Sequence, residues 1–410
     1  MNFEAFPPYR DPSCQVPVCC VTPEHGAAIH RFFDTSPISP SGKYLAACVL
    51  PYENRLPSPG DLAKILLVDL ETGKETIIAE TRGWGIQVGA NLQWGGEGIL
   101  YYNDVDTRTW VPCLVRHDIR NGSIRRMGQG IFMLSPDGRF ALTHNLSKSR
   151  LTQTGYGVAV PDAYALPNGD HPEDDGFFRT DTLSGQCTLF MPLSRLIDEG
   201  LENLAPFRNG QFYGFQCKWS PDGQRILYVM RCLVPGEKKH LAMVFTSDAQ
   251  GEDIRLALHW KEWAKGGHHV NWHPDSRHIT MNLILNGEHL KFVSFGYDGS
   301  NLHPILDEIF GSGHPSFHRD GKHLLTDAYV NGDPLFAKED GTVPLRLIDT
   351  EKRKDSVLLR MKTQTGSVSD FRVDPHPAWS YDFRYIAFNG YASGTRRVYV
   401  CEANDLLKEP

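Results

Sequence analysis

The sequence predicts an all-β protein, a seven-bladed β-propeller, and three observations lead to this fold class. First, one short motif recurs seven times along the 410 residues. Second, the copies lie 40 to 85 residues apart, and repeats of roughly 40–50 residues with four strands each are typical of propeller blades. Third, the copies fill most of the chain, and radial repetition of this kind leaves only short, protected sheet edges.

Each copy of the motif consists of an apolar or aromatic anchor, a Ser/His-Pro-Asp-Gly turn or a relic of it, and an apolar strand. Proline presets φ, aspartate bonds back to the local backbone and glycine adopts positive φ, so the motif predicts a β-hairpin. The anchor therefore ends the innermost strand of a blade. The copies are ISPSGKYLA from Ile38, WGGEGILYY from Trp94, LSPDGRFAL from Leu134, WSPDGQRILYV from Trp219, WHPDSRHITMN from Trp272, FHRDGKHLLTD from Phe317 and WSYDFRYIAFN from Trp379.

The two ends of the chain predict how the last blade is completed. The last copy runs out near Val400, so its blade lacks an outermost strand, and residues 15–21 (QVPVCCV) form an apolar run before the first anchor. We predict that this run supplies the missing strand, at a sheet edge because Pro17 cannot donate a ladder hydrogen bond. A disordered leader is the alternative. The expected organisation is one domain, residues 1–410, with residues 1–27 as its closing segment.

Composition and charge exclude several classes of function. The net charge is −7 and no cluster of lysine and arginine stands out, so nucleic acid is not an expected partner. No apolar stretch is long enough to cross a bilayer, and the N-terminus has neither region of a signal peptide. We therefore expect a cytoplasmic protein, or a chain that begins after a removed signal. The nine cysteines, odd in number and without a C-x-x-C spacing, fit reduced, buried thiols.

The residue three positions before each anchor is the strongest indication of function. It lies near the start of the innermost strand, at the mouth of the central channel, so equivalent residues of adjacent blades are expected to converge. Imidazole and amide ligands suit Mn, Zn, Fe or Ni, and Ca less well, which predicts a divalent metal site of Gln216, His269, His314 and His376, with His268 able to replace His269. A polar channel lining is the alternative. In chain order the seven residues are Thr35, Asn91, Ile131, Gln216, His269, His314 and His376.

The longest spacing follows Leu134 and indicates a loop insertion over the active face, residues 145–180. Long loops in compact folds often cover or bind ligands. This loop carries Arg150 and Gln153, and cationic side chains there suit an anionic substrate such as a uronate carboxylate, which arginine can bind with two hydrogen bonds. A solvated loop whose charges have no role is the alternative.

Three residues are acid–base candidates near the same mouth, because histidine and tyrosine can each move a proton in a pocket. His144 ends the strand before the insertion, Tyr156 lies within the insertion, and His30 precedes the first anchor by eight residues. For each of these residues, the alternative is a purely structural role.

Several segments resemble the propeller-fold polysaccharide lyases of the ulvan-lyase and rhamnosyl-glucuronate-lyase type. The later His-Pro repeats resemble, more distantly, oligogalacturonate lyase, and the repeats in general are similar to those of TolB propellers. The resemblance spans residues 28–400. The segments that carry it are RFFDTSPISPSGKYLA from Arg31, LPYENRLPSPGDLAKILLVDLETG from Leu50, ETRGWGIQVGANLQWG from Glu80 and TQTGYGVAVPD from Thr152.

The resemblance implies β-elimination at a uronic acid. A base removes the C5 proton, a positive group or a metal neutralises the carboxylate, and an acid protonates the leaving O4. It also implies that Tyr156 in GYGV is the catalytic tyrosine, that Arg179 in FFRTD neutralises the carboxylate, and that Tyr213 binds substrate.

Asn91 in GANLQWG departs from this pattern, because the family places its histidine base there. Asparagine cannot be a general base, so we predict that Asn91 binds substrate instead. Either His30 or His144 takes the role of the base, or the elimination chemistry is lost.

We expect an enzyme, a carbon–oxygen lyase that cleaves a 1,4-linkage to a uronic acid in an oligo- or polysaccharide and leaves an unsaturated uronate. One alternative is a glycoside hydrolase that releases terminal rhamnose from glucuronate, although no convincing inward pair of carboxylates is present. The other is a non-catalytic, TolB-like carbohydrate-binding propeller, which Asn91 favours. The ultraviolet absorbance of an unsaturated product distinguishes the lyase from both.

Overall fold

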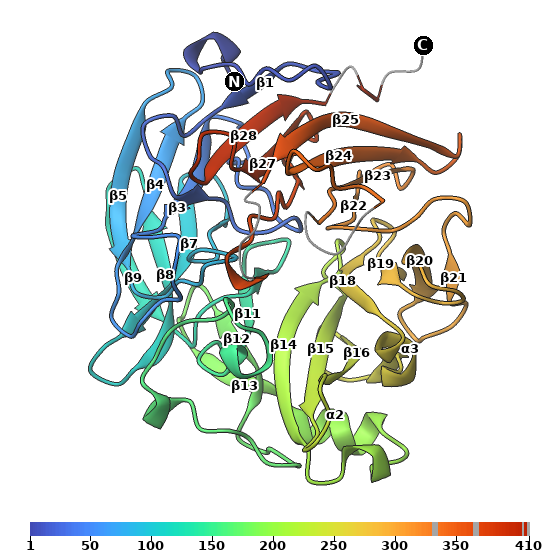
Figure 1. The fold of residues 1–410 in the computed structure, drawn as a ribbon. Helices are drawn as coiled ribbons and strands as arrows, with labels where there is room; N and C mark the ends of the chain where they lie inside the picture. Colours follow the sequence, from blue (N-terminus) through green and yellow to red (C-terminus); the bar gives the residue numbers. More distant parts are fainter. Residues whose placement is uncertain (330–334, 364–368, 404–405, 408–410) are drawn as a thin grey trace. The chain divides into compact units, whose positions relative to one another are not determined.

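The structure is a computed structural model that describes residues 1–329, 335–363, 369–403 and 406–407. Its strands form seven four-stranded sheets, the blades of a β-propeller, which confirms the predicted fold class (Figure 1). The chain divides into two compact units. The first consists of Met1–Asn103, His117–Ile124 and Ser312–Pro410, and the second of Asp104–Arg116 and Arg125–Gly311.

The first three blades are each built from four consecutive strands. Blade one consists of β2 (Ala28–Ile29), β3 (Tyr44–Val49), β4 (Ala63–Asp69) and β5 (Glu75–Thr81). Blade two consists of β6 (Gln93–Trp94), β7 (Ile99–Asp106), β8 (Val111–Asp118) and β9 (Ser123–Met127). Blade three consists of β10 (Met133–Leu134), β11 (Phe140–His144), β12 (Gly176–Asp181) and β13 (Cys187–Pro192).

Blades four to six follow the same order, with the inner strand first. Blade four consists of β14 (Gln211–Trp219), β15 (Arg225–Leu233), β16 (Leu241–Asp248) and β17 (Arg255–Leu258). Blade five consists of β18 (Gly267–Trp272), β19 (His278–Leu283), β20 (Lys291–Gly296) and β21 (His303–Pro304). Blade six consists of β22 (Ser316–Phe317), β23 (His323–Thr326), β24 (Thr342–Asp349) and β25 (Lys354–Lys362).

The last blade combines both ends of the chain, as predicted. Strands β26 (Ala378–Trp379), β27 (Tyr385–Gly390) and β28 (Arg397–Glu402) are followed outward by β1 (Val18–Cys20). In the antiparallel β1–β28 pair Val18 lies opposite Cys401 and Cys20 opposite Tyr399, and Figure 1 shows the two strands side by side. Residues 15–21 therefore supply the outermost strand of blade seven, and Pro17 precedes that strand.

The repeated turns show why the motif forms hairpins. In blade three the Ser135 hydroxyl donates to Asp137 Oδ1 over 2.5 Å, and the same oxygen accepts the backbone N–H of Arg139 over 3.0 Å. Gly138 adopts the left-handed conformation that completes the turn, with a φ of 71°. The anchors end inner strands in blades two to seven, so their apolar side chains pack in the core.

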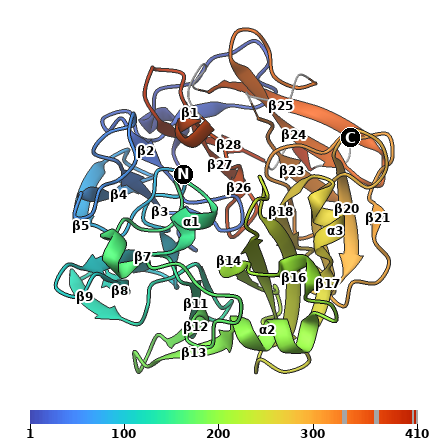
Figure 2. The ribbon, with the colours of Figure 1, turned by 60° about the horizontal axis from the view of Figure 1, so that its bottom comes forward.

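The helices are short and lie in the connections. They are η1 (Phe3–Ala5), α1 (Ser149–Thr152), η2 (Asp162–Tyr164), α2 (Leu193–Gly200), η3 (Ala205–Phe207), α3 (Trp260–Ala264) and η4 (Ser369–Phe371). In the second unit, Figure 2 shows α2 directly after β13. The predicted insertion, residues 145–180, holds α1 and η2, and its last residues already belong to β12. Among the described residues no helix has the length and apolarity needed to span a membrane.

Candidate functional site

The position three residues before the anchor has an unusual backbone in three blades. Asn91, His269 and His376 adopt left-handed φ angles of 59°, 60° and 49°. Such angles are uncommon for residues other than glycine, and they often mark sites where a side chain is held for function. Two of these residues, Asn91 and His376, lie in the first unit, and His269 lies in the second.

In the first unit the structure brings two of the predicted metal ligands together. The rings of His314 and His376 have centroids 4.2 Å apart, and both residues are buried. The ring of Phe32 packs against both imidazoles, at 5.5 Å from His314 and 4.7 Å from His376. We call His30, His314, His376, Asp327 and Asp374 the histidine cluster.

Asp327, at the end of β23, holds the two histidines in place. Its carboxylate accepts the backbone N–H of His314 over 2.7 Å and that of His376 over 3.1 Å. It also lies 2.9 and 3.0 Å from Nδ1 of His314. Because a carboxylate accepts the proton of Nδ1, the lone pair of a neutral His314 is on Nε2. This arrangement is the usual support for a histidine that binds a metal through its other nitrogen.

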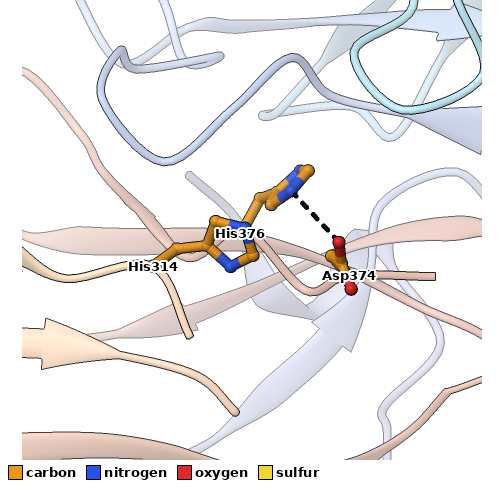
Figure 3. Close-up of side chains that lie close together, drawn as sticks. All are labelled: His314, Asp374 and His376. Carbon is orange, nitrogen blue, oxygen red and sulfur yellow. Dashed lines mark ion pairs between the residues drawn. The ribbon is translucent and has the colours of Figure 1, made fainter. Parts of the chain in front are cut away.

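Asp374 completes a group that could hold a cation, and the sequence analysis did not identify it. One ligand atom each of His314, Asp374 and His376 lies within 4.8 Å of the others, and all three residues are buried. Figure 3 shows His376 facing Asp374, with Nε2 of His376 3.8 Å from Oδ2 of Asp374. The signal for Asp374 was available, because it lies two residues before His376 in the sequence DPHP.

The chemistry of this group fits a divalent transition metal. Neither ring nitrogen of His376 has a hydrogen-bond partner among the described residues, although buried polar atoms normally have one. Burial lowers the pKa of His376, with the neighbouring His314 as a smaller cause, so the ring of His376 is ready to act as a neutral ligand. Two imidazole nitrogens and a carboxylate oxygen suit manganese or zinc better than calcium.

His30 is a buried neighbour of this group. Its backbone N–H donates to Asn389 over 3.0 Å, and burial lowers the pKa of its imidazole to about 4. The nearby backbone of Pro375 and His376 raises this pKa by a smaller amount. Neither ring nitrogen of His30 has a hydrogen-bond partner among the described residues. His30 is therefore neutral near pH 7, the form that can accept a proton.

Asn91, one of the predicted substrate-binding residues, is bound to a buried arginine. Nε of Arg31 donates to Asn91 Oδ1, and its Nη1 donates to Asp34 and Thr35. The amide of Asn91 thus has a structural partner in the first unit, and its predicted contact with substrate stays a prediction.

Gly313 sets the backbone on which the histidine cluster depends. It adopts a φ of 63°, and a methyl group at its Cα would overlap the backbone and carboxylate oxygens of Asp327. We expect Gly313→Ala to lower the free energy of unfolding by at least about 2 kcal/mol, the sum of left-handed strain and displacement of Asp327. Urea unfolding measures the loss.

Gly394→Ala is the matched control for that substitution. Gly394 lies in the same unit with a φ of 79°, but nothing lies within 4 Å of an added methyl group. It should show only the cost of the left-handed backbone, about 1 kcal/mol. Equal losses in the two variants would show that Asp327 is not displaced.

In the second unit, three predicted residues gather around Phe215 and a buried arginine. Arg231, on β15, lies 3.3 Å over the ring of Phe215, and the ring of Tyr156 packs edge-on against the same phenylalanine at 5.6 Å. Nη1 of Arg231 donates to Gln153 Oε1 over 3.1 Å. His144 completes the group, with its ring 6.2 Å from that of Phe215. We call His144, Gln153, Tyr156 and Arg231 the arginine cluster.

Arg231 has no ion-pair partner among the described residues, which is unusual for a buried charge. It is 7% exposed, and its guanidinium donates hydrogen bonds to the uncharged oxygens of Thr152 and Gln153. Burial lowers the pKa of its guanidinium to about 9, and the interaction with Tyr156 opposes this shift. A buried cation without a carboxylate is costly and indicates a site for an anionic ligand. The sequence did not reveal Arg231, because it lies inside an apolar strand.

The lowered pKa of the buried His144 predicts how the stability of the protein changes in acid. Its Nε2 is 2.8 Å from the hydroxyl of Ser149, and burial lowers its pKa to about 3 from 6.5. The unfolded chain therefore binds a proton below pH 6.5 that the folded chain does not. Stability should fall as pH drops from 6.5 towards 4, with His144 contributing up to about 1.4 kcal/mol per pH unit.

His144→Gln, which can still bond to Ser149, should flatten this dependence. Urea midpoints of wild type and variant at several pH values between 4 and 7 measure the difference. Parallel curves would mean that His144 is protonated in the folded protein.

The remaining predicted residues lie in the second unit with other partners. Nη2 of Arg150 donates to Asp162 over 2.5 Å, and the hydroxyl of Tyr213 donates to Gln211 over 2.9 Å. The guanidinium of Arg179 lies 4.0 Å over Phe190 and donates to the carbonyl of Ala249 over 3.1 Å. Their predicted contacts with substrate stay predictions.

Two of the four predicted metal ligands also lie in the second unit. Gln216 follows a bulge in β14 and is buried, and His269 lies in β18, with Nδ1 2.9 Å from that of His268. Their predicted role as ligands of one site with His314 and His376 stays a prediction.

Comparisons with known proteins show the fold. No protein-family model matches the chain, and no curated protein matches it. A solved oligogalacturonate lyase from Vibrio parahaemolyticus is 12% identical with a TM-score of 0.67, covering 98% of both chains. An oligogalacturonate lyase in complex with manganese is 15% identical with a TM-score of 0.66, covering 98% of this chain and 97% of that one.

A third structure extends the likeness beyond lyases. The β-propeller domain of the Trilobed protease from Pyrococcus furiosus is 11% identical with a TM-score of 0.52, covering 90% of this chain and 95% of that one. Identities this low establish a shared propeller architecture and no more. The finer resemblance to ulvan and rhamnosyl-glucuronate lyases stays a prediction.

Proposed function

We propose that the protein is a lyase that cleaves a 1,4-linkage to a uronic acid by β-elimination. One observation carries this proposal, the buried guanidinium of Arg231, which has no ion-pair partner among the described residues and lies beside Tyr156. A planar carboxylate is the ligand that best matches an arginine fork. Tyrosine and neutral histidine are groups that transfer protons. The arginine cluster thus combines a carboxylate binder with two proton carriers.

The elimination requires three tasks that these residues can perform. Arg231 binds the uronate carboxylate and stabilises the charge that develops there as the C5 proton leaves. The C5–H electrons form the C4–C5 double bond, the C4–O4 bond breaks, and O4 takes up a proton. Tyr156 is the proton carrier beside Arg231, and His144 is held neutral by burial, so it can accept a proton.

The histidine cluster supplies a place for a divalent ion. His314, Asp374 and His376 would hold it, and Asp327 orients His314. When bound, such an ion supplies positive charge that can neutralise a carboxylate. Manganese is in the name of one structurally similar oligogalacturonate lyase, which supports manganese as the first ion to test. His30, a member of the same cluster, is a second neutral base candidate.

The substrate we propose is a uronate-containing oligo- or polysaccharide. Two structures of the same architecture are named oligogalacturonate lyases, and this supports oligogalacturonate as the first compound to test. Glucuronate-containing oligosaccharides are the second, because of the sequence resemblance to ulvan-type lyases. The two solved lyases are 12% and 15% identical to this chain, so the proposed substrate class rests on the arginine cluster.

Incubation with purified oligosaccharides tests the function directly. The protein is mixed with oligogalacturonate or ulvan fragments, with and without manganese, and the ultraviolet absorbance of an unsaturated uronate is followed. Product formation that requires Arg231 supports the lyase. New reducing ends without absorbance would show a hydrolase instead.

A binding propeller without chemistry is the second candidate, and Asn91 favours it. Asn91 lies where the family places a base and is held by Arg31. Binding of uronate oligosaccharides, measured calorimetrically, with neither absorbance nor new reducing ends would establish this function.

A further inference from the structure

Two of the seven motif turns carry a pair of histidines in place of the usual residues. In blades three, four and seven a serine follows the anchor, as Ser135, Ser220 and Ser380. In blades five and six a histidine takes this place and another stands five residues later, giving H-x-D-x-x-H. The blade-six turn holds His318, Asp320 and His323. We call these three residues the blade-six triad, and it lies outside the histidine and arginine clusters.

The turn itself fixes the central carboxylate of the triad. Asp320 Oδ1 accepts the backbone N–H of Lys322 over 2.8 Å and that of His323 over 3.1 Å. Its other oxygen, Oδ2, lies 2.8 Å from Nδ1 of His318 and 2.7 Å from Nδ1 of His323. Two imidazoles therefore converge on one carboxylate oxygen, with ligand atoms within 4.8 Å of one another.

The nitrogen of His318 that faces the carboxylate carries a lone pair. The backbone N–H of Asp320 donates to this Nδ1 over 3.3 Å, which places the proton of a neutral ring on Nε2. This lone pair lies 2.8 Å from Asp320 Oδ2, so the two atoms repel each other unless a positive centre, a proton or a metal ion, lies between them.

Aromatic packing holds the ring of His318, and a second carboxylate lies close to the ring of His323. The ring of His318 is fixed by Trp379 at 5.3 Å and by Phe383 at 4.8 Å. Asp349 lies opposite His323 in the β23–β24 pair, and its Oδ2 is 3.7 Å from Nε2 of His323. A carboxylate behind Nε2 is the usual support for a histidine that binds a metal through its other nitrogen, and here the metal would replace the proton that Nδ1 shares with Asp320 over 2.7 Å.

We propose that the blade-six triad binds a divalent transition ion, best matched by zinc, through Nδ1 of His318, Nδ1 of His323 and Oδ2 of Asp320. Two imidazoles and one carboxylate are a common zinc ligand set, and the fourth position is left to water. The bound ion supplies the positive charge between Asp320 and the two imidazoles, and it ties the turn of blade six to the ring of His318, which packs on blade seven. This site is independent of the proposed lyase function.

The equivalent turn of blade five provides an internal comparison. His273 and His278 also flank an aspartate, with Nδ1 atoms 3.2 and 2.6 Å from Asp275 Oδ2. However, His278 lies opposite Gly296 in its strand pair, so no carboxylate side chain stands behind it there. The support of Asp349 belongs to blade six, which is why we assign the ion to that turn.

Zinc counting on the full chain tests the proposal. Native mass spectrometry at graded zinc concentrations compares wild type with His323→Gln, and His278→Gln is the matched control in blade five. We expect His323→Gln to hold one zinc ion fewer per chain and His278→Gln to equal wild type. Any ion at the histidine cluster is common to all three proteins and cancels in the comparison.

A graded variant and a stability measurement complete the test. Asp349→Asn should weaken zinc binding at this site about 10–100-fold without removing a ligand. Added zinc should raise the thermal midpoint of wild type by more than that of His323→Gln, and the midpoints without metal show whether each variant is folded. Equal zinc content in wild type and folded His323→Gln overturns the proposal, as does loss of the same ion in His278→Gln.

Discussion

Arg231→Met is expected to lower kcat/KM on uronate oligosaccharides by about 10²–10³-fold while leaving the free energy of unfolding unchanged or raised. Methionine fills the space over Phe215 without a charge. The buried guanidinium has no ion pair among the described residues, so its removal abolishes a desolvation cost and breaks the bonds to Thr152 and Gln153 and the cation–π contact with Phe215. Steady-state kinetics and urea unfolding on the same preparation measure the two effects.

Arg225→Met is the matched control, because Arg225 lies on the same strand with a carboxylate partner. Its Nη1 is 2.9 Å from Asp253, and its guanidinium lies 3.9 Å over Tyr297. This variant should lose stability and keep kcat/KM. If Arg231→Met instead unfolds more easily and keeps its activity, Arg231 is structural and the lyase proposal loses its main support.

His376→Gln is expected to abolish the stabilisation that a divalent ion gives the wild type. At a free manganese concentration 100 times the dissociation constant, binding adds about 2.7 kcal/mol to the free energy of unfolding. The variant lacks one of the three ligands and should gain almost nothing. Without metal it should be no less stable than wild type, because His376 makes no hydrogen bond through its ring among the described residues. Thermal unfolding with and without manganese measures both.

His303→Gln serves as the control for a histidine outside any cluster. His303 is exposed and bonds to the carbonyl of Asn301. It should respond to manganese as wild type does. A full manganese response in His376→Gln would show that the ion binds elsewhere, and loss of stability without metal would show that His376 is structural.

The repeat allowed the architecture to be predicted because each turn is a local structure. Serine and aspartate at fixed positions form the same hydrogen bond in blades three, four and seven, so short segments were sufficient to find the hairpins. The position of β1 followed from a different argument, a missing strand in the last blade, and it was also correct. Both predictions depended on the order of residues along the chain.

The side-chain clusters were less predictable, because they depend on contacts between strands far apart in sequence. The repeat position identified His314 and His376, but it gave no reason to choose Asp374, which stands two residues away from that position. In the sequence, Arg231 is a single charged residue within an apolar strand. Its importance is visible only when burial and the lack of a paired carboxylate among the described residues are known together.

The pairing of β1 with β28 has a consequence for the way the protein is made. Val18 pairs with Cys401, so the last sheet cannot form until the chain has been synthesised through Cys401. Contacts of such high sequence separation form slowly, because a long loop must close before they contribute. Until then residues 15–21 lack the strand with which they pair. The blades in between are built from consecutive strands, so they can assemble before the final sheet does.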